Sequence, residues 1–399
     1  MRKTICIALL VSLIFGTNIS TIDAKPRVKS RVKPKAPVSA KPKETPSPYQ
    51  ARLLVEADTG QVLYEDNPHK KWPPASMVKM MLALIVMEKL KEGSIQLTAP
   101  VTVSQSATRI GGSQVYLKEG EVFTLEELME AVLIASANDA STAVAEYVAG
   151  SVEACVQLMN EQAKALGMND TQYFNVHGLP AKAGQQDDVT TAYDSVILAR
   201  ELVKYPDVLR WTSTEEARFR NNTLTLTITN HLIGSFPGAD GLKTGYIARS
   251  RFNLTATAKR GDMRLIAVVL GGVSSHVRFQ EAARLLSMGF DTYHKQIVLR
   301  KEQPFNQTLS VKKGQSQSMK PIAAEDAVVI IKKGEAQHLS LQPELPEFVE
   351  APVNKGQELG KVSIMLSNHT LVTVPLVAPE DIPRANLLWR LFHYLDVNP

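Results

Sequence analysis

The sequence predicts an α+β domain, in which helices flank an antiparallel sheet, followed by a small all-β sandwich domain. Helical periodicity dominates residues 73–204, and strand-like runs replace it from residue 222 before a helix returns at 277–289. From about residue 296 the helical pattern ends, and short β-prone runs alternate with turns of Gly, Pro and Asn. A length of 399 residues is sufficient for two such domains.

The first predicted domain begins with a hairpin and a buried helix. Residues 53–57 and 61–65 are strand-like runs on either side of an Asp-Thr-Gly turn. A Pro-Pro pair then suits the first turn of a helix, which is predicted over 75–91. Its stretch 77–87 is apolar on every side except at Lys79, which indicates a helix that is buried all round.

Further elements follow in order along both domains. Thr124 and Glu127 are spaced as a capping box at the start of a helix over 124–135. Other predicted helices are 139–166, 190–204 and 277–289, and predicted strands are 223–229, 252–258 and 264–271. The second domain contains β-prone runs typical of a sandwich, at 297–299, 308–311, 327–331, 361–366 and 371–376.

The two ends of the chain differ in composition from the middle. Basic residues precede an apolar run at 5–15, which predicts a cleaved signal peptide over 1–24, with an uncleaved anchor helix as the alternative. Residues 25–48 combine eight basic residues with six prolines, which predicts an extended linker or a segment that associates with anionic polymers. The predicted domains then occupy 49–294 and 295–383, followed by a terminal helix at 384–399.

Charge and metal-binding residue types exclude several classes of function. The chain carries a net charge of +5, but residues 1–24 carry +1 and residues 25–43 carry +8, so the remainder carries −4. A nucleic-acid-binding domain is therefore not expected. Two cysteines cannot form a disulfide scaffold, and none of the eight histidines has an i, i+4 partner or a nearby cysteine. We expect neither a metal nor another cofactor.

The first motif with a chemical meaning is Ser76-x-x-Lys79. Three residues along a helix place the hydroxyl and the ammonium on the same face. A serine becomes a nucleophile beside a base, and burial lowers the pKa of a lysine so that it can act as that base. The same spacing occurs at Ser30 and Ser310, but neither copy has an apolar wall around its lysine.

Two further motifs fall on predicted boundaries of secondary structure. Ser136-Ala137-Asn138 lies between two predicted helices, where a hydroxyl and a carboxamide can project into a cleft; taken alone, it also suits a helix cap. Lys243-Thr244-Gly245 begins a predicted edge strand at 242–247, and its glycine permits close approach of a ligand. Taken alone, this third motif is also compatible with an exposed strand.

The three motifs in this order resemble the serine penicillin-binding proteins and β-lactamases. Flanking segments narrow the resemblance, over about residues 50–290, to the low-molecular-mass penicillin-binding proteins, which are D-alanyl-D-alanine carboxypeptidases. These segments are 112–115, 117–120, 177–180, 190–194, 239–246, 263–266 and 271–272. The resemblance implies a β-lactamase/transpeptidase-like first domain, and the β domain and C-terminal tail resemble the second domain and anchor of the same family.

The resemblance also implies a role for each site residue. Ser76 would attack the carbonyl between the two D-alanines of a peptidoglycan pentapeptide, and Lys79 would accept its proton. Ser136 would relay a proton to the leaving amine, and Asn138 would bind the substrate amide. The backbone N–H groups of Ser76 and Tyr246 would form the oxyanion hole. The terminal carboxylate of the substrate would bind beside the edge strand and a nearby helix, at Lys243, Thr244, Gly245 and Arg278. β-Lactam antibiotics would acylate the same serine.

Some positions and functions stay open. Arg278 could also be a solvated residue of its helix. Val78 stands where the family usually has Thr, and we interpret it as a packing residue. Tyr246 stands where His is common in the family, and we expect it to tune turnover. A class A β-lactamase would need a glutamate in 171–200, which contains none. A non-catalytic wall-binding scaffold would not need a buried lysine beside a serine. The choice between strict carboxypeptidase activity and added endopeptidase or transpeptidase activity stays undecided.

The C-terminal segment has the pattern of an amphipathic helix. Over 385–396 five large apolar residues share one side of a helix, and Asn386, Arg390 and His393 share the other. The segment is too short to span a bilayer, which predicts an anchor lying in the membrane surface. A terminal helix folded back on the protein or a dimer contact is the alternative. We therefore expect an exported, periplasmic enzyme on the outer face of the cytoplasmic membrane.

Overall fold

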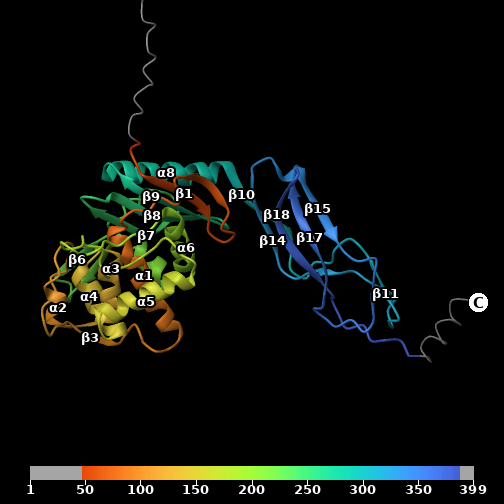
Figure 1. Cartoon of the computed structure of the whole chain (residues 1–399), viewed down its shortest axis with the longest axis horizontal. Coiled ribbons are helices and arrows are strands. Elements are labelled where there is room, and N and C mark those ends of the chain that lie inside the picture. Colours follow the sequence, from red (N-terminus) through yellow and green to blue (C-terminus); the bar gives the residue numbers. More distant parts are fainter. Residues whose placement is uncertain (1–46, 387–399) are drawn as a thin grey trace, which may run out of the picture. The chain divides into compact units, whose positions relative to one another are not determined.

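The computed structural model describes residues 47–386. The predictions for the signal peptide, for most of the linker and for most of the terminal helix lie outside the described residues. Within 47–386, no helix is both long enough and apolar enough to cross a membrane. The predicted α+β domain and the small all-β domain are both present, and each is described by itself (Figure 1).

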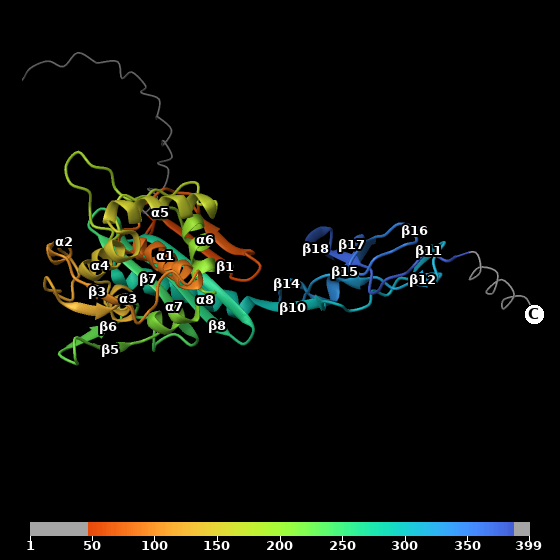
Figure 2. The ribbon, with the colours of Figure 1, turned by 90° about the horizontal axis from the view of Figure 1, so that it is seen from below.

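A five-stranded antiparallel sheet forms the centre of the first domain, in the order β2-β1-β9-β8-β7. Its strands are β1 (Ala51–Glu56), β2 (Val62–Asp66), β7 (Ala239–Ile247), β8 (Arg251–Arg260) and β9 (Met263–Gly272). Helix α8 (Ser275–Thr292) covers one face, while the other helices lie on the opposite face (Figures 1 and 2). The sheet therefore separates two apolar cores, and β7 is left as an edge strand.

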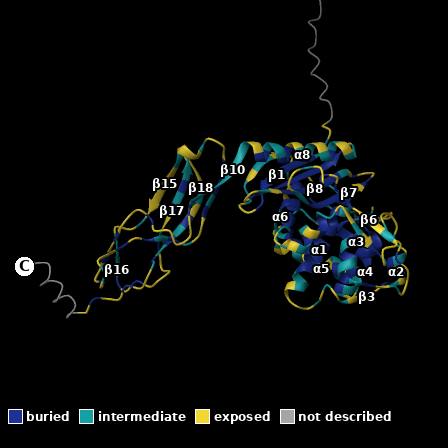
Figure 3. Ribbon diagram, turned by 180° about the vertical axis from the view of Figure 1, so that it is seen from behind, coloured by how far each residue is buried: buried dark blue, intermediate teal, exposed yellow. Residues whose placement is uncertain are grey.

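The helical layer is built around a helix that is buried on every side, as predicted. Residues 79–87 of α1 (Lys79–Lys91) are all buried, and a short 3-10 turn, η1 (Ala75–Val78), precedes the helix. Figure 3 shows this buried interior in the first domain. The surrounding elements are α2 (Gln105–Thr108), α3 (Leu125–Leu133), α4 (Asn138–Ala149), α5 (Val152–Ala165), α6 (Ala192–Leu202), α7 (Pro206–Thr212) and the ribbons β3 (Pro100–Thr102) with β4 (Val122–Thr124) and β5 (Glu216–Phe219) with β6 (Leu224–Thr227).

Local signals explain where these helices begin and end. The capping box of Thr124 and Glu127 is confirmed, because each side chain bonds the other residue's backbone N–H. The prediction of one helix over 139–166 is wrong. Gly150 adopts a left-handed conformation with φ of 80° and ends α4, and the Ser151 hydroxyl then caps α5 by accepting the N–H of Ala154.

The edge strand β7 passes directly over the turn that opens α1. A Cβ atom added to Gly245 would lie 2.3 Å from the Pro74 carbonyl oxygen, so only glycine fits there. On the other side, the Asn253 carboxamide of β8 donates to the carbonyls of Pro73 and Pro74 and accepts the N–H of Gly271. These contacts bring the first and third motifs together at one end of the sheet.

The second domain consists of short strands in three small sheets. Their orders are β10-β14, β12-β11-β16 and β13-β18-β17-β15. Two apolar clusters fill this domain, one around Val362 and Val374 and the other around Leu309 and Val353. The strands are β10 (Tyr293–Leu299), β11 (Leu309–Lys312), β12 (Ser318–Met319), β13 (Ile322–Ala323), β14 (Ala327–Lys332), β15 (Leu339–Glu344), β16 (Phe348–Glu350), β17 (Glu358–Leu366) and β18 (His369–Val377), with the 3-10 turn η2 (Ala336–His338) between β14 and β15.

Candidate active site

The first motif places Ser76 in η1 and Lys79 at the first position of α1. The turn begins with Ala75, whose φ of 51° is uncommon for a residue with a side chain. Ser76 is half-buried, whereas the Lys79 side chain is completely buried. The two residues are in contact, with 3.2 Å between Lys79 Nζ and Ser76 Oγ. Val78 is also completely buried, which agrees with its interpretation as a packing residue.

Lys79 has two other close partners, both of which are carbonyl oxygens. Its Nζ donates to Asn138 Oδ1 at 2.7 Å and to the His177 backbone oxygen at 2.8 Å. Burial lowers the lysine pKa well below its ordinary value, and the nearby positive charge of Lys243 lowers it further. A neutral amine has two hydrogens, which the two carbonyls accept, and one lone pair, which is then left for the Ser76 hydroxyl.

The second motif occupies the turn between α3 and α4. Asn138 joins two parts of the site, since its Oδ1 faces Lys79 and its Nδ2 donates to the Gly111 oxygen at 2.7 Å. Ser136 is buried, with a φ of 61°, and no hydrogen bond joins its hydroxyl to Ser76 or Lys79 in the described part of the chain. The helix-cap alternative is not supported, because the residue that caps α4 is Ala137.

The third motif and Arg278 form a group of buried cations. Lys243 and Arg278 are 1% and 8% exposed, so the alternative of a solvated Arg278 is wrong. Burial lowers the pKa of Lys243 to about 7, with Arg278 contributing, and lowers that of Arg278 to about 10. Within 47–386 neither side chain has an acidic partner. Buried charges are normally paired, so this pair of cations is suited to an anionic ligand.

Backbone contacts hold Arg278 against the edge strand, to which Lys243 itself belongs. Arg278 Nη1 donates to the backbone oxygens of Gly245 and Asn253 at 3.3 and 3.2 Å. The Thr244 hydroxyl contacts that of Thr229 at 2.7 Å. Tyr246, by contrast, is 55% exposed and packs its ring on Phe252, with 4.4 Å between the centroids.

The sequence did not reveal the loop that supports Lys79. Asp188 is buried and accepts the N–H groups of Phe174 and Asn175 and the Asn175 side-chain amide. Asn175 Oδ1 in turn accepts the N–H groups of His177 and Gly178. This network orients the His177 carbonyl toward Lys79. The only sequence signal was the motif beginning at His177, whose important group is a backbone oxygen that any residue would provide.

Asp139 is a second supporting carboxylate that sequence reasoning missed. It is completely buried beside Asn138 and accepts the N–H groups of Val115 and Leu117. The backbone N–H of Asn138 also donates to the Ser113 oxygen at 2.7 Å. The segment before the second motif is thereby tied to the start of α4. No group of three or more His, Cys, Asp or Glu side chains able to hold a metal occurs in residues 47–386.

Comparison with known proteins gives matches to both domains. Residues 39–274 match the family model described as D-alanyl-D-alanine carboxypeptidase. Residues 293–384 match the model described as penicillin-binding protein 5, C-terminal domain. The D-alanyl-D-alanine carboxypeptidase DacF of Bacillus subtilis is 37% identical over 343 residues, which cover 85% of this chain and 87% of that protein.

Solved structures agree with this result. Penicillin-binding protein 5 from Haemophilus influenzae has a TM-score of 0.76 and 28% identity, covering 84% of this chain and 98% of that one. Penicillin-binding protein D2 from Listeria monocytogenes, in an ampicillin-bound form, has a TM-score of 0.56 and 29% identity, covering 61% of this chain and 97% of that one. These matches support the prediction of a peptidase. They do not support the alternatives of a β-lactamase or a non-catalytic scaffold.

The network of Asp188 generates a prediction. Asp188→Asn should slow acylation of the serine by a β-lactam by about 10- to 100-fold. The carboxylate of Asp188 accepts three hydrogen bonds, which a single amide oxygen cannot do, so we expect the His177 carbonyl to move. Loss of the negative charge also destabilises the Lys79 ammonium. The acid limb of the rate–pH profile should therefore move to lower pH. Stopped-flow acylation between pH 4 and 9 measures both effects.

The control is the neighbouring acid. Asp187→Asn removes a half-buried carboxylate that accepts the N–H of Ala181 and pairs with Arg249, and its profile should keep the wild-type midpoint. If Asp188→Asn lowers the melting temperature but keeps both the wild-type rate and the wild-type midpoint, Asp188 has a purely structural role.

Proposed function

Since the chain belongs to the D-alanyl-D-alanine carboxypeptidase family, a family of serine peptidases, we propose that it removes the terminal D-alanine from peptidoglycan pentapeptides. The reaction passes through an acyl-enzyme on Ser76. One observation carries this proposal: a completely buried lysine contacts the serine hydroxyl while two carbonyl oxygens accept its hydrogens. β-Lactams acylate the same serine.

The first step is attack by Ser76 Oγ on the carbonyl between the two D-alanines. The lone pair of neutral Lys79 takes the hydroxyl proton as the new C–O bond forms. The negative charge that develops on the carbonyl oxygen needs N–H donors, and we assign this role to the backbone of Ser76 and Tyr246. Tyr246 suits it because edge strand β7 has β8 on one side only.

The second step expels D-alanine, whose nitrogen must gain a proton. Ser136 is the residue that we assign to this relay, from the Lys79 ammonium to the leaving amine. Its buried position two residues before Asn138 supports the assignment. The missing hydrogen bond in the free enzyme is compatible with it, because catalytic hydrogen bonds often form only with substrate. Asn138 binds the substrate amide, and water then hydrolyses the acyl-enzyme.

The terminal carboxylate of the substrate binds Lys243, Thr244 and Arg278, beside Gly245. The buried cations without acidic partners support this assignment, because a carboxylate would supply the missing charge. An arginine also recognises a carboxylate through its planar fork of donors. Exposed Tyr246 lies next to this group and offers an aromatic surface instead of a titratable imidazole.

The enzyme is proposed to act outside the cytoplasm, held at the membrane surface by residues 384–399. The N-terminal signal-peptide pattern supports export. The first residues of this segment still belong to the β domain, because Ala385 is buried and its backbone N–H donates to the Lys313 oxygen, while the match to the C-terminal domain model ends at residue 384. The amphipathic pattern over 385–396 supports the anchor itself.

The nucleophile is tested by Ser76→Ala. This variant should stay folded yet lose both covalent labelling by fluorescent penicillin and release of D-alanine from a pentapeptide, measured by mass spectrometry. Ser310→Ala is the matched control, because it removes the serine of another Ser-x-x-Lys copy that is exposed in the β domain. Labelling that survives in Ser76→Ala would refute the assignment.

The carboxylate site is tested by Arg278→Ala. The variant should lose about 10- to 100-fold in kcat/KM for a peptide with a free terminal carboxylate, since a charge-assisted hydrogen bond is worth about 1.5–3 kcal/mol. The methyl ester of the same peptide should lose much less. Arg284→Ala removes a more exposed arginine of the same helix and serves as control. Equal losses on both substrates would give Arg278 a structural role only.

The anchor is tested by deleting residues 387–399, which leaves in place Arg384 and Ala385, whose backbones pair with the β domain. With about five apolar side chains, each contributing at most about 1.5–3 kcal/mol, membrane binding should be reversible. The truncated enzyme should appear in the soluble fraction with unchanged activity on a small peptide. Continued sedimentation with membranes, or loss of activity, would contradict the anchor.

A further inference from the structure

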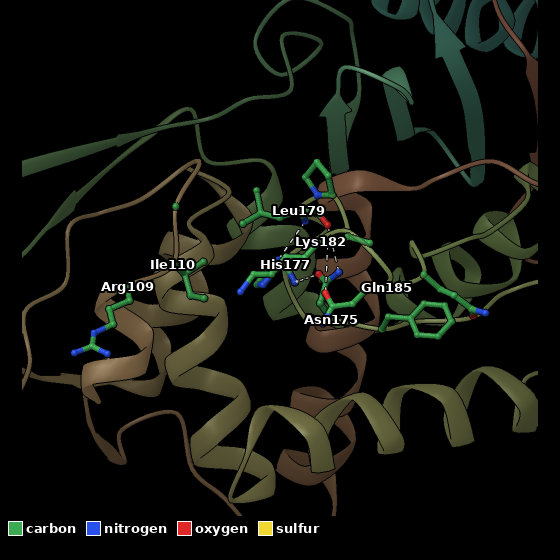
Figure 4. A pocket seen from close by; sticks show the side chains of 12 residues that line it. Arg109, Ile110, Asn175, His177, Leu179, Lys182 and Gln185 are labelled. Atoms are coloured by element: carbon green, nitrogen blue, oxygen red, sulfur yellow. Dashed lines mark hydrogen bonds between the residues drawn. The ribbon is translucent and has the colours of Figure 1, made fainter.

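A pocket lies beside the nucleophile, between the loop at 109–111 and the loop at 174–186. Its volume is about 520 Å³, and it is lined by neither Lys243, Thr244 nor Arg278. It is therefore separate from the group of cations assigned to the terminal carboxylate. Figure 4 shows side chains from the two loops on opposite sides: Arg109 and Ile110 on one, and Asn175, His177, Leu179, Lys182 and Gln185 on the other.

Two contacts place this pocket next to the reacting atoms. His177 lines it, and the backbone oxygen of the same residue accepts from Lys79 at 2.8 Å and lies 3.4 Å from Ser76 Oγ. Gly111 lines the opposite side, and its oxygen accepts the Asn138 amide. Because the leaving D-alanine is assigned to the cations of β7 and α8, the pocket is available to the acyl part of the substrate.

The charges that line the pocket all have the same sign. Lys182 and Arg109 both line it, whereas no Asp or Glu does. Neither cation has an ion-pair partner in the described part of the chain. The two acids that follow the loop in sequence have other partners: Asp187 pairs with Arg249 and accepts the N–H of Ala181, and Asp188 accepts the N–H groups of Phe174 and Asn175. The pocket therefore offers uncompensated positive charge to a ligand.

His177 adds an uncharged donor. Burial is the main cause that lowers the pKa of its imidazole to about 4, so the ring is neutral at physiological pH. Its Nδ1 accepts the N–H of Leu179 at 3.1 Å, which leaves the proton on Nε2. A neutral ring with an Nε2–H group can donate to an oxygen atom without adding a charge beside Lys79.

We propose that this pocket binds a carboxylate carried by the acyl part of the substrate, with Lys182 and Arg109 as charged partners and His177 Nε2–H as a third donor. The inference rests on the proposed function, in which a peptide chain precedes the scissile bond. It makes the enzyme selective for acyl groups with an acidic side chain or end group. Recognition of the acyl part thus uses residues different from those that bind the leaving D-alanine.

The test uses pairs of synthetic D-Ala-D-Ala substrates. In each pair the N-terminal acyl chain, of four to six carbons, ends either in a carboxylate or in the corresponding uncharged amide. For wild type, kcat/KM should be about tenfold higher for the carboxylate at the best chain length, as expected for charge-assisted hydrogen bonds. In the double variant Arg109→Gln/Lys182→Gln this ratio should fall to about one. Lys91→Gln, which removes an exposed lysine outside the pocket, should keep the wild-type ratio.

A charge reversal makes the test independent of a simple loss of activity. Arg109→Gln/Lys182→Glu should prefer an acyl chain that ends in an amine over one that ends in a carboxylate. A wild-type ratio of one at every chain length, or an unchanged ratio in the double variant, overturns the pocket assignment while release of D-alanine upholds the proposed function. If wild type releases D-alanine from none of these substrates or from pentapeptide, the proposed function fails together with the inference.

Discussion

The chemistry of the contact between Lys79 and Ser76 depends on the complete burial of the lysine side chain. Burial in apolar surroundings raises the free energy of the lysine ammonium relative to water. The pKa of Lys79 therefore falls, and the neutral amine becomes available. The rest of the first domain supplies the conditions for this. Helix α1 is surrounded by apolar side chains, η1 presents the serine, and the carbonyls of Asn138 and His177 accept the amine hydrogens. Each of these partners comes from a different part of the chain, and so the site requires the complete fold.

The buried cation Lys243 interacts electrostatically with both Lys79 and Arg278. Burial is the main cause that lowers the pKa of both Lys79 and Lys243. The positive charge of Lys243 lowers the pKa of Lys79 further, and that of Arg278 lowers the pKa of Lys243 further. Asp139 and Asp188 act in the opposite sense on Lys79, because each carboxylate favours its ammonium form. The excess of positive charge makes an anionic ligand favourable on the cleft side. After burial, which is the main cause, this positive charge also favours the neutral form of Lys79, so the proposed carboxylate site and the proposed base are electrostatically linked.

The parts of the site that follow local rules could be predicted from the sequence. The spacing of Ser76 and Lys79, the apolar stretch around them and the capping box of Thr124 each depend on residues that are close together in the chain. All three appear as expected, although Ser76 lies in the 3-10 turn before α1. The break between α4 and α5 was missed because the pattern on both sides of Gly150 stays helical. The network of Asp188 and Asn175 was missed for a different reason. It is formed by tertiary contacts that end on a backbone carbonyl, and backbone atoms leave no signature in a sequence.

The loop at 174–188 links the two halves of the site. Its inner side holds the His177 carbonyl against Lys79, and its outer side lines the pocket with His177 and Lys182. Gly178 shows how closely the inner side fits, since an added Cβ atom would lie 2.1 Å from the Ala75 oxygen. His177 therefore belongs to both features, because the residue lines the pocket and its backbone carbonyl accepts a hydrogen bond from Lys79.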